Sequence, residues 1–182
     1  MTTSNWNIDP THSGINFAIR HMVVSKVRGR FAKYTGTLSL DDEDLTRSSV
    51  EATIDSSSID TAAAQRDDHL RSADFFDVEK FPELRFRSTR IERVDDGAYR
   101  LIGELTIRDV TRELWLDVEY GGRAKDPWGN ERIGFIARGA LDRKDFGLGW
   151  NQLLETGGVL VGERLEIELE VQAVKVPAVR AA

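Results

Sequence analysis

The chain has 182 residues, a size that one hydrophobic core can serve, and its 31 acidic and 25 basic side chains leave a net charge of -6. This acidic balance argues against a nucleic-acid surface, which needs clustered cations. The chain has no cysteine, which excludes disulfides, thiolate nucleophiles, Fe–S clusters and Cys-ligated zinc. We therefore expect a single domain that does not bind nucleic acid.

The first residues carry no cationic stretch leading into an apolar one, and no apolar run approaches the roughly 18 residues of a membrane span. From these features we expect a cytoplasmic protein that does not insert into a membrane. The expected domain covers residues 1–182, with its core at about 5–175 and a flexible tail at 177–182.

Apolar and polar residues alternate with a period of two along most of the chain, which predicts half-buried β-strands. Strands with one apolar face belong to antiparallel sheets. Two stretches, 29–40 and 132–143, are long enough for unusually long strands. Eight segments show the alternation, in chain order 15–19, 34–40, 50–54, 84–86, 99–107, 114–120, 133–141 and 165–173.

Short segments rich in Asp, Asn and Gly separate several of these strands, and this composition predicts hairpin turns at 95–97, 126–130 and 161–163. One helix is expected from Asp60 to about Ala73. Asp60 is a suitable N-cap, three alanines follow it, and Pro82 bars continuation.

Eight antiparallel strands with one helix fit either a closed up-and-down barrel or a two-sheet sandwich. The strands are long and mostly sequential, and closure removes exposed sheet edges. We therefore predict an all-β fold, an eight-stranded antiparallel up-and-down barrel with one short helix inserted between strands.

Small residues interrupt the apolar face of this predicted barrel. They indicate a hollow bore, and an elongated apolar hollow suits a long-chain lipid better than a compact metabolite. The alternative is that bulky neighbours fill the gaps, and the pattern leaves both interpretations open. The small residues are Gly36, Ala52, Gly103, Ala137, Gly139 and Ala173.

A series of ordered motifs resembles the YceI-like family over about residues 5–175. The resemblance implies a lipocalin-like barrel whose apolar pore holds a polyisoprenoid, an isoprenoid quinone or another long-chain lipid or amide, often in a homodimer. The motifs are Trp6-x-Ile8-Asp9-Pro10-x-His12-Ser13, Arg20-His21, Gly29-x-Phe31, Arg66-Asp67-x-His69-Leu70-x-Ser72-x-Asp74-Phe75-Phe76-Asp77, Phe81-Pro82, Phe86-x-Ser88, Gly103-x-Leu105-Thr106-Ile107 and Arg143-x-Asp145-Phe146-Gly147.

The residues expected to line the pore or its mouth combine the inward face of the strands with the loop that follows Gly147. In the expected helix, Arg66, Asp67 and His69 form a polar network with the barrel or contact a lipid headgroup. The expected lipid-binding residues are Phe17, Ile19, Phe31, Leu38, Phe76, Phe86, Leu101, Leu105, Leu116, Phe135, Ala137, Trp150, Leu154 and Leu169.

No catalytic or metal site is expected. Asp9, His12 and Ser13 supply the residue types of a catalytic triad, but they lie within five residues and suit a turn, with Asp9 in an Asx-turn beside Pro10. The three histidines, His12, His21 and His69, show no metal-binding spacing. No cofactor is expected other than a bound lipid.

The sequence and the resemblance together predict a protein that binds a long-chain apolar lipid for sequestration or transport. Two other classes stay open. One is a hydrolase or isomerase that acts on an isoprenoid lipid with a histidine as acid or base. The other is a stress-related interaction module whose cavity is incidental.

Overall fold

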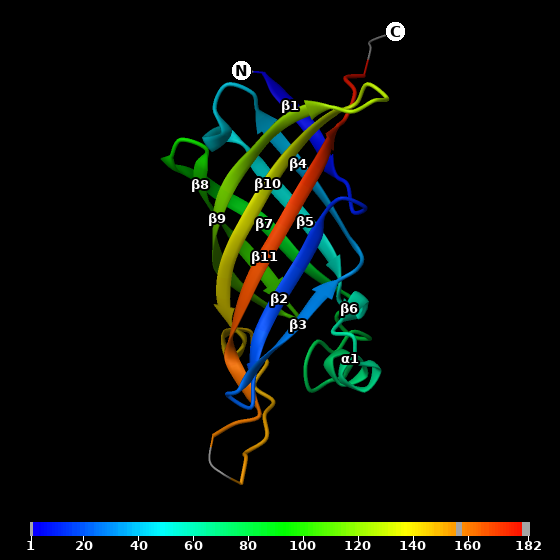
Figure 1. Cartoon of the computed structure of the whole chain (residues 1–182), viewed down its shortest axis with the longest axis vertical. Helices are drawn as coiled ribbons and strands as arrows, with labels where there is room; N and C mark the ends of the chain where they lie inside the picture. The colour runs from blue at the N-terminus through cyan, green and yellow to red at the C-terminus, as the bar shows by residue number, and fades with distance from the viewer. Residues whose placement is uncertain (1, 156–157, 180–182) are drawn as a thin grey trace.

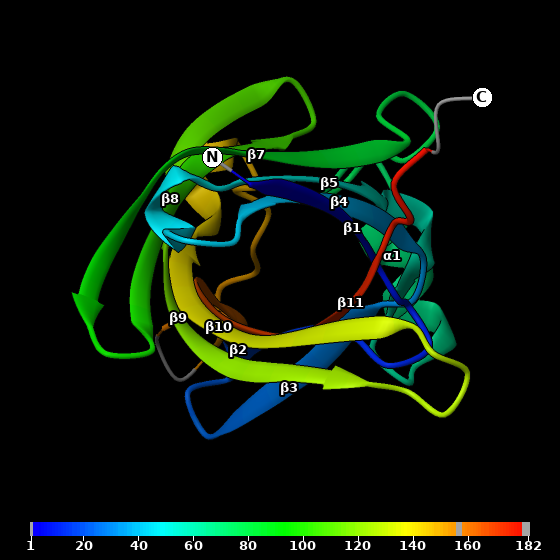
Figure 2. The ribbon, with the colours of Figure 1, turned by 90° about the horizontal axis from the view of Figure 1, so that it is seen from above.

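The computed structural model describes residues 2–155 and 158–179, and eight antiparallel strands form a closed barrel in it (Figures 1 and 2). Neighbours around the barrel are joined in sequence, and the last strand, β11, pairs with the first, β1. The up-and-down barrel is confirmed and the sandwich is wrong. The strands are β1 (Thr3–Ile8), β2 (Gly14–His21), β3 (Ser25–Phe31), β4 (Tyr34–Asp41), β5 (Ser49–Asp55), β6 (Ile59–Asp60), β7 (Glu83–Asp95), β8 (Ala98–Ile107), β9 (Val110–Lys125), β10 (Glu131–Asp142) and β11 (Val161–Lys175).

Two of the eight barrel strands are split in two. β1 pairs with the C-terminal end of β11 and β2 with its N-terminal half, while β4 and β3 run beside β1 and β2. The strand expected at 29–40 is therefore interrupted after Phe31, and the loop 9–13 separates β1 from β2. Pro10 explains the second break, because proline cannot donate to a strand ladder.

Side chains of the loop 9–13 form hydrogen bonds that hold the segment between β1 and β2 against the barrel wall. Asp9 accepts a hydrogen bond from the backbone N–H of Thr11 at 3.0 Å, which is the expected Asx-turn. The Ser13 hydroxyl donates to the Gln172 carbonyl at 3.1 Å and accepts from the Gln172 N–H at 2.9 Å. His12 Nδ1 lies 2.8 Å from Asp9 Oδ2. Since Ser13 bonds the backbone of β11, these three residues serve the fold and do not form a triad.

Two of the three expected hairpin turns are confirmed, between β7 and β8 and between β9 and β10. The turn expected at 161–163 is wrong, because β11 already begins at Val161. A register irregularity between Val161 and Leu165 occupies this place. Gly162 allows close contact with β2, since a Cβ there would lie 3.3 Å from the Cβ of Arg20. A bulge and a turn require the same permissive residues.

The inserted helix is shorter than expected. α1 spans Ala64–Arg71. Three short 3-10 helices lie elsewhere in the chain, at Leu45–Arg47, Ser56–Ser58 and Arg143–Phe146. Asp60 lies in β6 and accepts from the N–H of Ala62. The helix is fixed instead by Asp67, whose carboxylate accepts from the N–H of Thr61 at 2.9 Å.

The apolar core consists of two clusters at different heights in the barrel. A compact cluster joins β1, β4, β10 and β11 toward the upper end of the barrel in Figure 1, and a larger one extends along the interior to the segment around α1. Within the described ranges, no helix has both the length and the apolar composition needed to cross a membrane. The compact cluster contains Trp6, Leu38, Leu40, Ile133 and Ala173.

Candidate functional site

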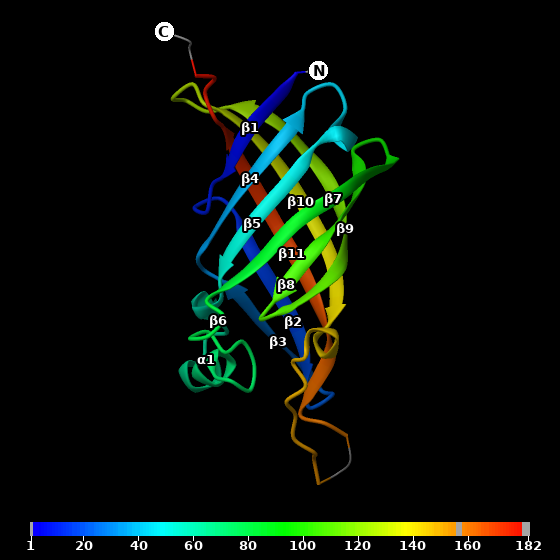
Figure 3. The same cartoon turned by 180° about the vertical axis from the view of Figure 1, so that it is seen from behind.

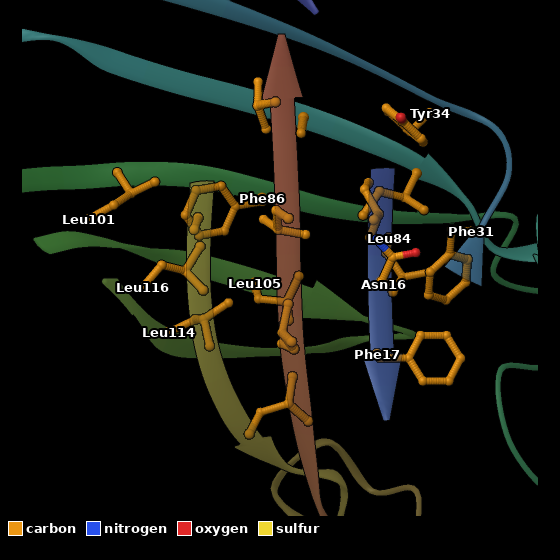
Figure 4. A pocket seen from close by; sticks show the side chains of 18 of the residues that line it. Asn16, Phe17, Phe31, Tyr34, Leu84, Phe86, Leu101, Leu105, Leu114 and Leu116 are labelled. Carbon is orange, nitrogen blue, oxygen red and sulfur yellow. The ribbon is translucent and has the colours of Figure 1, made fainter. Parts of the chain in front are cut away.

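An apolar cavity of about 280 Å³ lies inside the barrel (Figure 4). Leucine side chains from β8 and β9 gather on one wall, and aromatic side chains from β2, β3 and β4 gather on the other. Twelve of the expected lining residues face this cavity, namely Phe17, Ile19, Phe31, Leu38, Phe76, Phe86, Leu101, Leu105, Leu116, Phe135, Ala137 and Leu169.

The cavity is long and narrow. On β10 its lining extends from Phe135 to Leu141. At the rise of a β-strand this stretch covers roughly 20 Å. A volume near 280 Å³ spread over this length describes a channel that fits one extended chain better than a broad ring system.

The two ends of the channel differ in how tightly their side chains are packed. At the upper end, the side chains of the compact cluster are at most 4% exposed. Arg123 and Lys175 lie over the Trp6 ring, 5.3 and 5.8 Å from its centroid. At the lower end, inward-facing residues of β2 and β11, including Ile19 and Leu165, are partly exposed. The mouth of the channel therefore lies beside the lower ends of β2 and β11.

The small residues on the inner face do not all create the hollow. An added Cβ at Gly36 would collide with Ile8, and one at Gly103 would collide with Phe86. Ala173 belongs to the compact cluster. Bulky neighbours therefore fill these positions, as the alternative interpretation held. Of the small residues, Ala52 and Ala137 do border the channel.

Tyr34 is a polar residue on the aromatic wall. Its hydroxyl is buried and has no hydrogen-bond partner within the described ranges. Burial raises the pKa of the hydroxyl, and the nearby negative charge of Asp9 raises that pKa further. The neutral hydroxyl is therefore available to donate a hydrogen bond to an oxygen of a molecule in the channel.

The segment around α1 covers the side of the channel through a row of aromatic rings. Phe17 and Phe31 have ring centroids 5.7 Å apart, and Phe31 meets Phe76 edge to face at the same separation. Phe76 follows α1, so this row anchors the helical segment to β2 and β3. Offset and edge-to-face pairs of this kind stabilise a contact beyond their buried area.

Arg143 fixes the loop between β10 and β11 at the mouth. Its guanidinium donates to the carbonyl oxygens of Leu148 at 2.5 Å, Trp150 at 2.8 Å and Gly162 at 2.7 Å. Burial lowers the pKa of this side chain, which is 3% exposed. The carbonyl groups compensate the buried charge, and the loop is held against the start of β11.

The remaining expected site residues lie outside the channel wall. Trp150 is half-buried and packs on His69, and Leu154 is half-buried in the loop before residue 156. Arg66 donates to the Thr61 hydroxyl and Asp67 accepts from it. These bonds link α1 to Thr61, directly after β6, while His69 lies against Trp150.

The histidines are dispersed over the molecule. His12 lies in the loop 9–13, His21 ends β2, and His69 lies in α1. In the part of the chain that the structure describes, no three His, Asp or Glu side chains are placed to hold a metal ion. No histidine is among the residues that face the channel in these ranges.

Several residues that build the channel and its ends were not predicted from the sequence. Trp6 lies in β1, which is not among the eight predicted strands, although the period of two at Ser4, Trp6 and Ile8 would have revealed it. Leu84 and Leu148 line the channel from segments that were interpreted as a short strand and a loop. The role of Arg143 depends on carbonyl groups, which have no signal in the sequence.

Fold and cavity define a closed antiparallel barrel with an apolar internal channel. The model of the YceI-like domain matches residues 6–173, and the chain belongs to this family. A UPF0312 protein of Staphylococcus epidermidis is 40% identical over 166 residues, which cover 91% of this chain and 94% of that protein.

Two solved structures share the barrel. The YCEI protein of Campylobacter jejuni has 30% identity and a TM-score of 0.74, with 87% of this chain and 91% of that chain covered. A polyisoprenoid binding domain from Saccharophagus degradans has 13% identity and a TM-score of 0.66, with 94% and 98% covered. The second likeness is one of fold.

Proposed function

We propose that this protein binds a long-chain apolar lipid, a polyisoprenoid, an isoprenoid quinone or a long-chain fatty amide, inside the barrel for sequestration or transport. The observation that carries the proposal is the channel itself, which is long, narrow, apolar and tightly packed at one end. Burial of a hydrocarbon chain there contributes roughly 25 cal/mol per Å² of apolar surface. The description of the Saccharophagus degradans domain as polyisoprenoid binding supports the same ligand class.

The polar groups around the channel favour binding over catalysis. The hydroxyl of Tyr34 is a buried polar group in the channel lining, and it suits a carbonyl or amide oxygen. Asp9 holds negative charge nearby, so an uncharged polar group fits better than a carboxylate. A histidine acting as acid or base would have to reach the ligand from outside the lining.

Chain length provides the sharpest test. Delipidated protein is titrated with a series of fluorescent amides that differ by single methylenes. Each added methylene should tighten Kd by about fourfold, from about 0.8 kcal/mol per buried methylene, until the chain outgrows a channel of roughly 20 Å. Equal affinity for short and long chains would refute a channel-bound ligand.

Native mass spectrometry of protein purified from a bacterial host, followed by organic extraction, identifies the bound class. We expect a substoichiometric apolar ligand. Turnover of this lipid that a single histidine substitution abolishes would favour the enzyme. A stoichiometric protein partner in place of any lipid would favour the interaction module.

A further inference from the structure

The turn between β2 and β3 is unusual for a hairpin. It consists of Met22, Val23 and Val24, whose exposed fractions are 44%, 67% and 84%. Met22 and Val23 have positive φ angles of 53° and 66°. Glycine, asparagine and aspartate adopt this conformation readily, whereas a β-branched residue there is strained. Exposed aliphatic residues therefore occupy positions that local backbone energetics would give to small polar ones.

A second apolar side chain lies beside this turn. The N–H of Met22 donates to the carbonyl of Leu160 at 2.9 Å, and the N–H of Leu160 donates to Gln152 at 2.9 Å. The next residue, Leu153, is 82% exposed. The turn and the loop before β11 project together from the lower end of the barrel (Figures 1 and 3). We call the four residues Met22, Val23, Val24 and Leu153 the apolar tip.

The apolar tip adjoins the mouth of the channel. Ile19 lines the channel three residues before Met22, and Val161 lines it directly after Leu160. His21 pairs with Val161 across the two strands. A molecule that enters or leaves the channel at this end therefore passes the apolar tip.

Cationic side chains surround the tip on the outer face of the same strands. Arg20 is opposite Lys26 in the ladder, and Arg28 and Arg164 are exposed nearby. The acidic neighbours pair with lysines, Glu166 with Lys26 at 2.8 Å and Glu163 with Lys144. Within the described ranges Arg20, Arg28 and Arg164 form no ion pair, so the outer face beside the tip keeps unpaired cations in a chain of net charge -6.

We propose that the apolar tip docks on an anionic lipid bilayer. Exposed aliphatic residues backed by Arg and Lys are the chemistry that binds the interface of anionic membranes, where the apolar groups enter the headgroup region and the cations contact the headgroups. The tip then holds the channel mouth against the bilayer. The inference extends the proposed lipid binding by naming a membrane as the source or acceptor of the ligand.

Vesicle co-sedimentation tests the docking. The parent protein should bind vesicles of phosphatidylcholine mixed with phosphatidylglycerol, and bind pure phosphatidylcholine more weakly. Replacement of Arg20 or Arg164 by glutamine should weaken binding to the anionic vesicles by about fivefold each. A parent protein that does not bind anionic vesicles overturns the proposal.

A redesigned turn keeps the test independent of folding. The triple substitution Met22→Asn, Val23→Gly and Val24→Ser replaces the apolar groups by residues that suit the positive φ angles. We expect the melting temperature to hold or rise while vesicle affinity falls by more than about tenfold. Trp128, 81% exposed in the hairpin at the opposite end, provides the matched control, and Trp128→Ser should bind vesicles like the parent. Unchanged binding of the triple variant, or loss of binding in Trp128→Ser, overturns the docking.

Two further measurements separate the alternatives. Sedimentation velocity of parent and triple variant shows whether the tip instead joins two copies of this chain, in which case a dimer would become a monomer and the membrane proposal would be wrong. Titration with a fluorescent lipid in the absence of vesicles should give the same Kd for both proteins. If neither protein binds that lipid while the parent still binds vesicles, the docking stands and the proposed channel function fails.

Discussion

The imidazole of His69 meets the ring of Trp150 edge to face, with ring centroids 4.5 Å apart. This contact joins α1 to the loop that Arg143 holds, and Phe75 packs on both rings. Asp74 orients the imidazole through a contact of 2.8 Å to its Nε2. Two segments far apart in the sequence thus meet beside the channel mouth.

Trp150→Ala should speed ligand exchange. Loss of an aromatic contact worth about 0.5–1.5 kcal/mol is expected to raise the dissociation rate of a bound fluorescent lipid roughly two- to twelvefold. The association rate should rise as well, so Kd should change by less than the rates. Stopped-flow displacement measures both rates. Trp115→Ala, which removes a half-exposed ring from the outer wall, serves as control. Identical exchange in parent and Trp150→Ala would show that the contact does not control the mouth.

Ala137→Phe and Ala173→Leu should have opposite effects on the stability of the lipid-free protein. Ala137 borders the channel, so the larger ring enters space that the lipid would occupy. Lipid-free Ala137→Phe protein should keep or gain stability and bind lipid much more weakly. Ala173 is 0% exposed in the compact cluster, and Ala173→Leu should lose roughly 1–3 kcal/mol of unfolding free energy through overpacking. Thermal unfolding and lipid titration of each variant check this. Equal destabilisation of both apoproteins would indicate a filled bore.

Gly103→Ala should destabilise the barrel wall. An added Cβ would lie 2.6 Å from the Arg87 carbonyl oxygen and would also collide with the Phe86 ring. Rearrangement of this close contact is expected to cost about 1–3 kcal/mol of unfolding free energy, measured by urea denaturation. Gly149→Ala is the matched control, because nothing lies within 4 Å of its added Cβ. Equal midpoints for the two variants would contradict the packing of Phe86 over Gly103.

We expect the free energy of unfolding to fall in acid, because the two carboxylates that pair with Arg132 become protonated. Hydrogen bonds from Thr11, Arg132 and His12 hold the pKa of Asp9 well below its usual range. Burial raises the pKa of Asp126, but hydrogen bonds from Arg132 and Asn130 outweigh it and lower that pKa to about 2. A lowered carboxyl pKa stabilises the fold above the pKa of the unfolded chain, and this stabilisation is lost as the pH falls toward the folded value.

Denaturant unfolding should therefore show a decreasing free energy of unfolding from about pH 5 to pH 2. Arg132→Met should be less stable at pH 7 and should show a shallower decrease. Arg138→Met, which removes an exposed cation from the outer wall of β10, should change little. A parent-like pH profile for Arg132→Met would assign the acid sensitivity to other carboxylates.

The barrel could be predicted from the sequence because strands and turns each leave a pattern within a short stretch of residues. Alternation of apolar and polar residues along 99–107 or 165–173 predicts a half-buried strand, and the turn residues at 95–97 predict a hairpin. Alternation also placed Phe135 and Ala137 on the inner face. Alternation does not show what covers a small residue. For this reason the sequence left open whether Gly36 and Gly103 border empty space, and the structure shows that Ile8 and Phe86 cover them.

Other features depend on contacts between distant segments. The split of β1 from β2 is stabilised by Ser13 on Gln172, and the mouth by His69 on Trp150. The hydroxyl of Tyr34 has no hydrogen-bond partner within the described ranges because the fold places apolar side chains around it. Such properties arise from tertiary packing, which periodicity alone does not encode.

Closure of the barrel between β1 and β11 has a consequence for biosynthesis. Ser13 and Gln172, which bond across this seam, are 159 residues apart. At the usual rate of 5–20 residues per second, a ribosome needs roughly 8–30 s to make the chain between them. During this interval the growing sheet keeps two open edges and its apolar face is incomplete. The nascent chain therefore exposes unpaired strand edges, which favour aggregation, until β11 emerges and closes the ring.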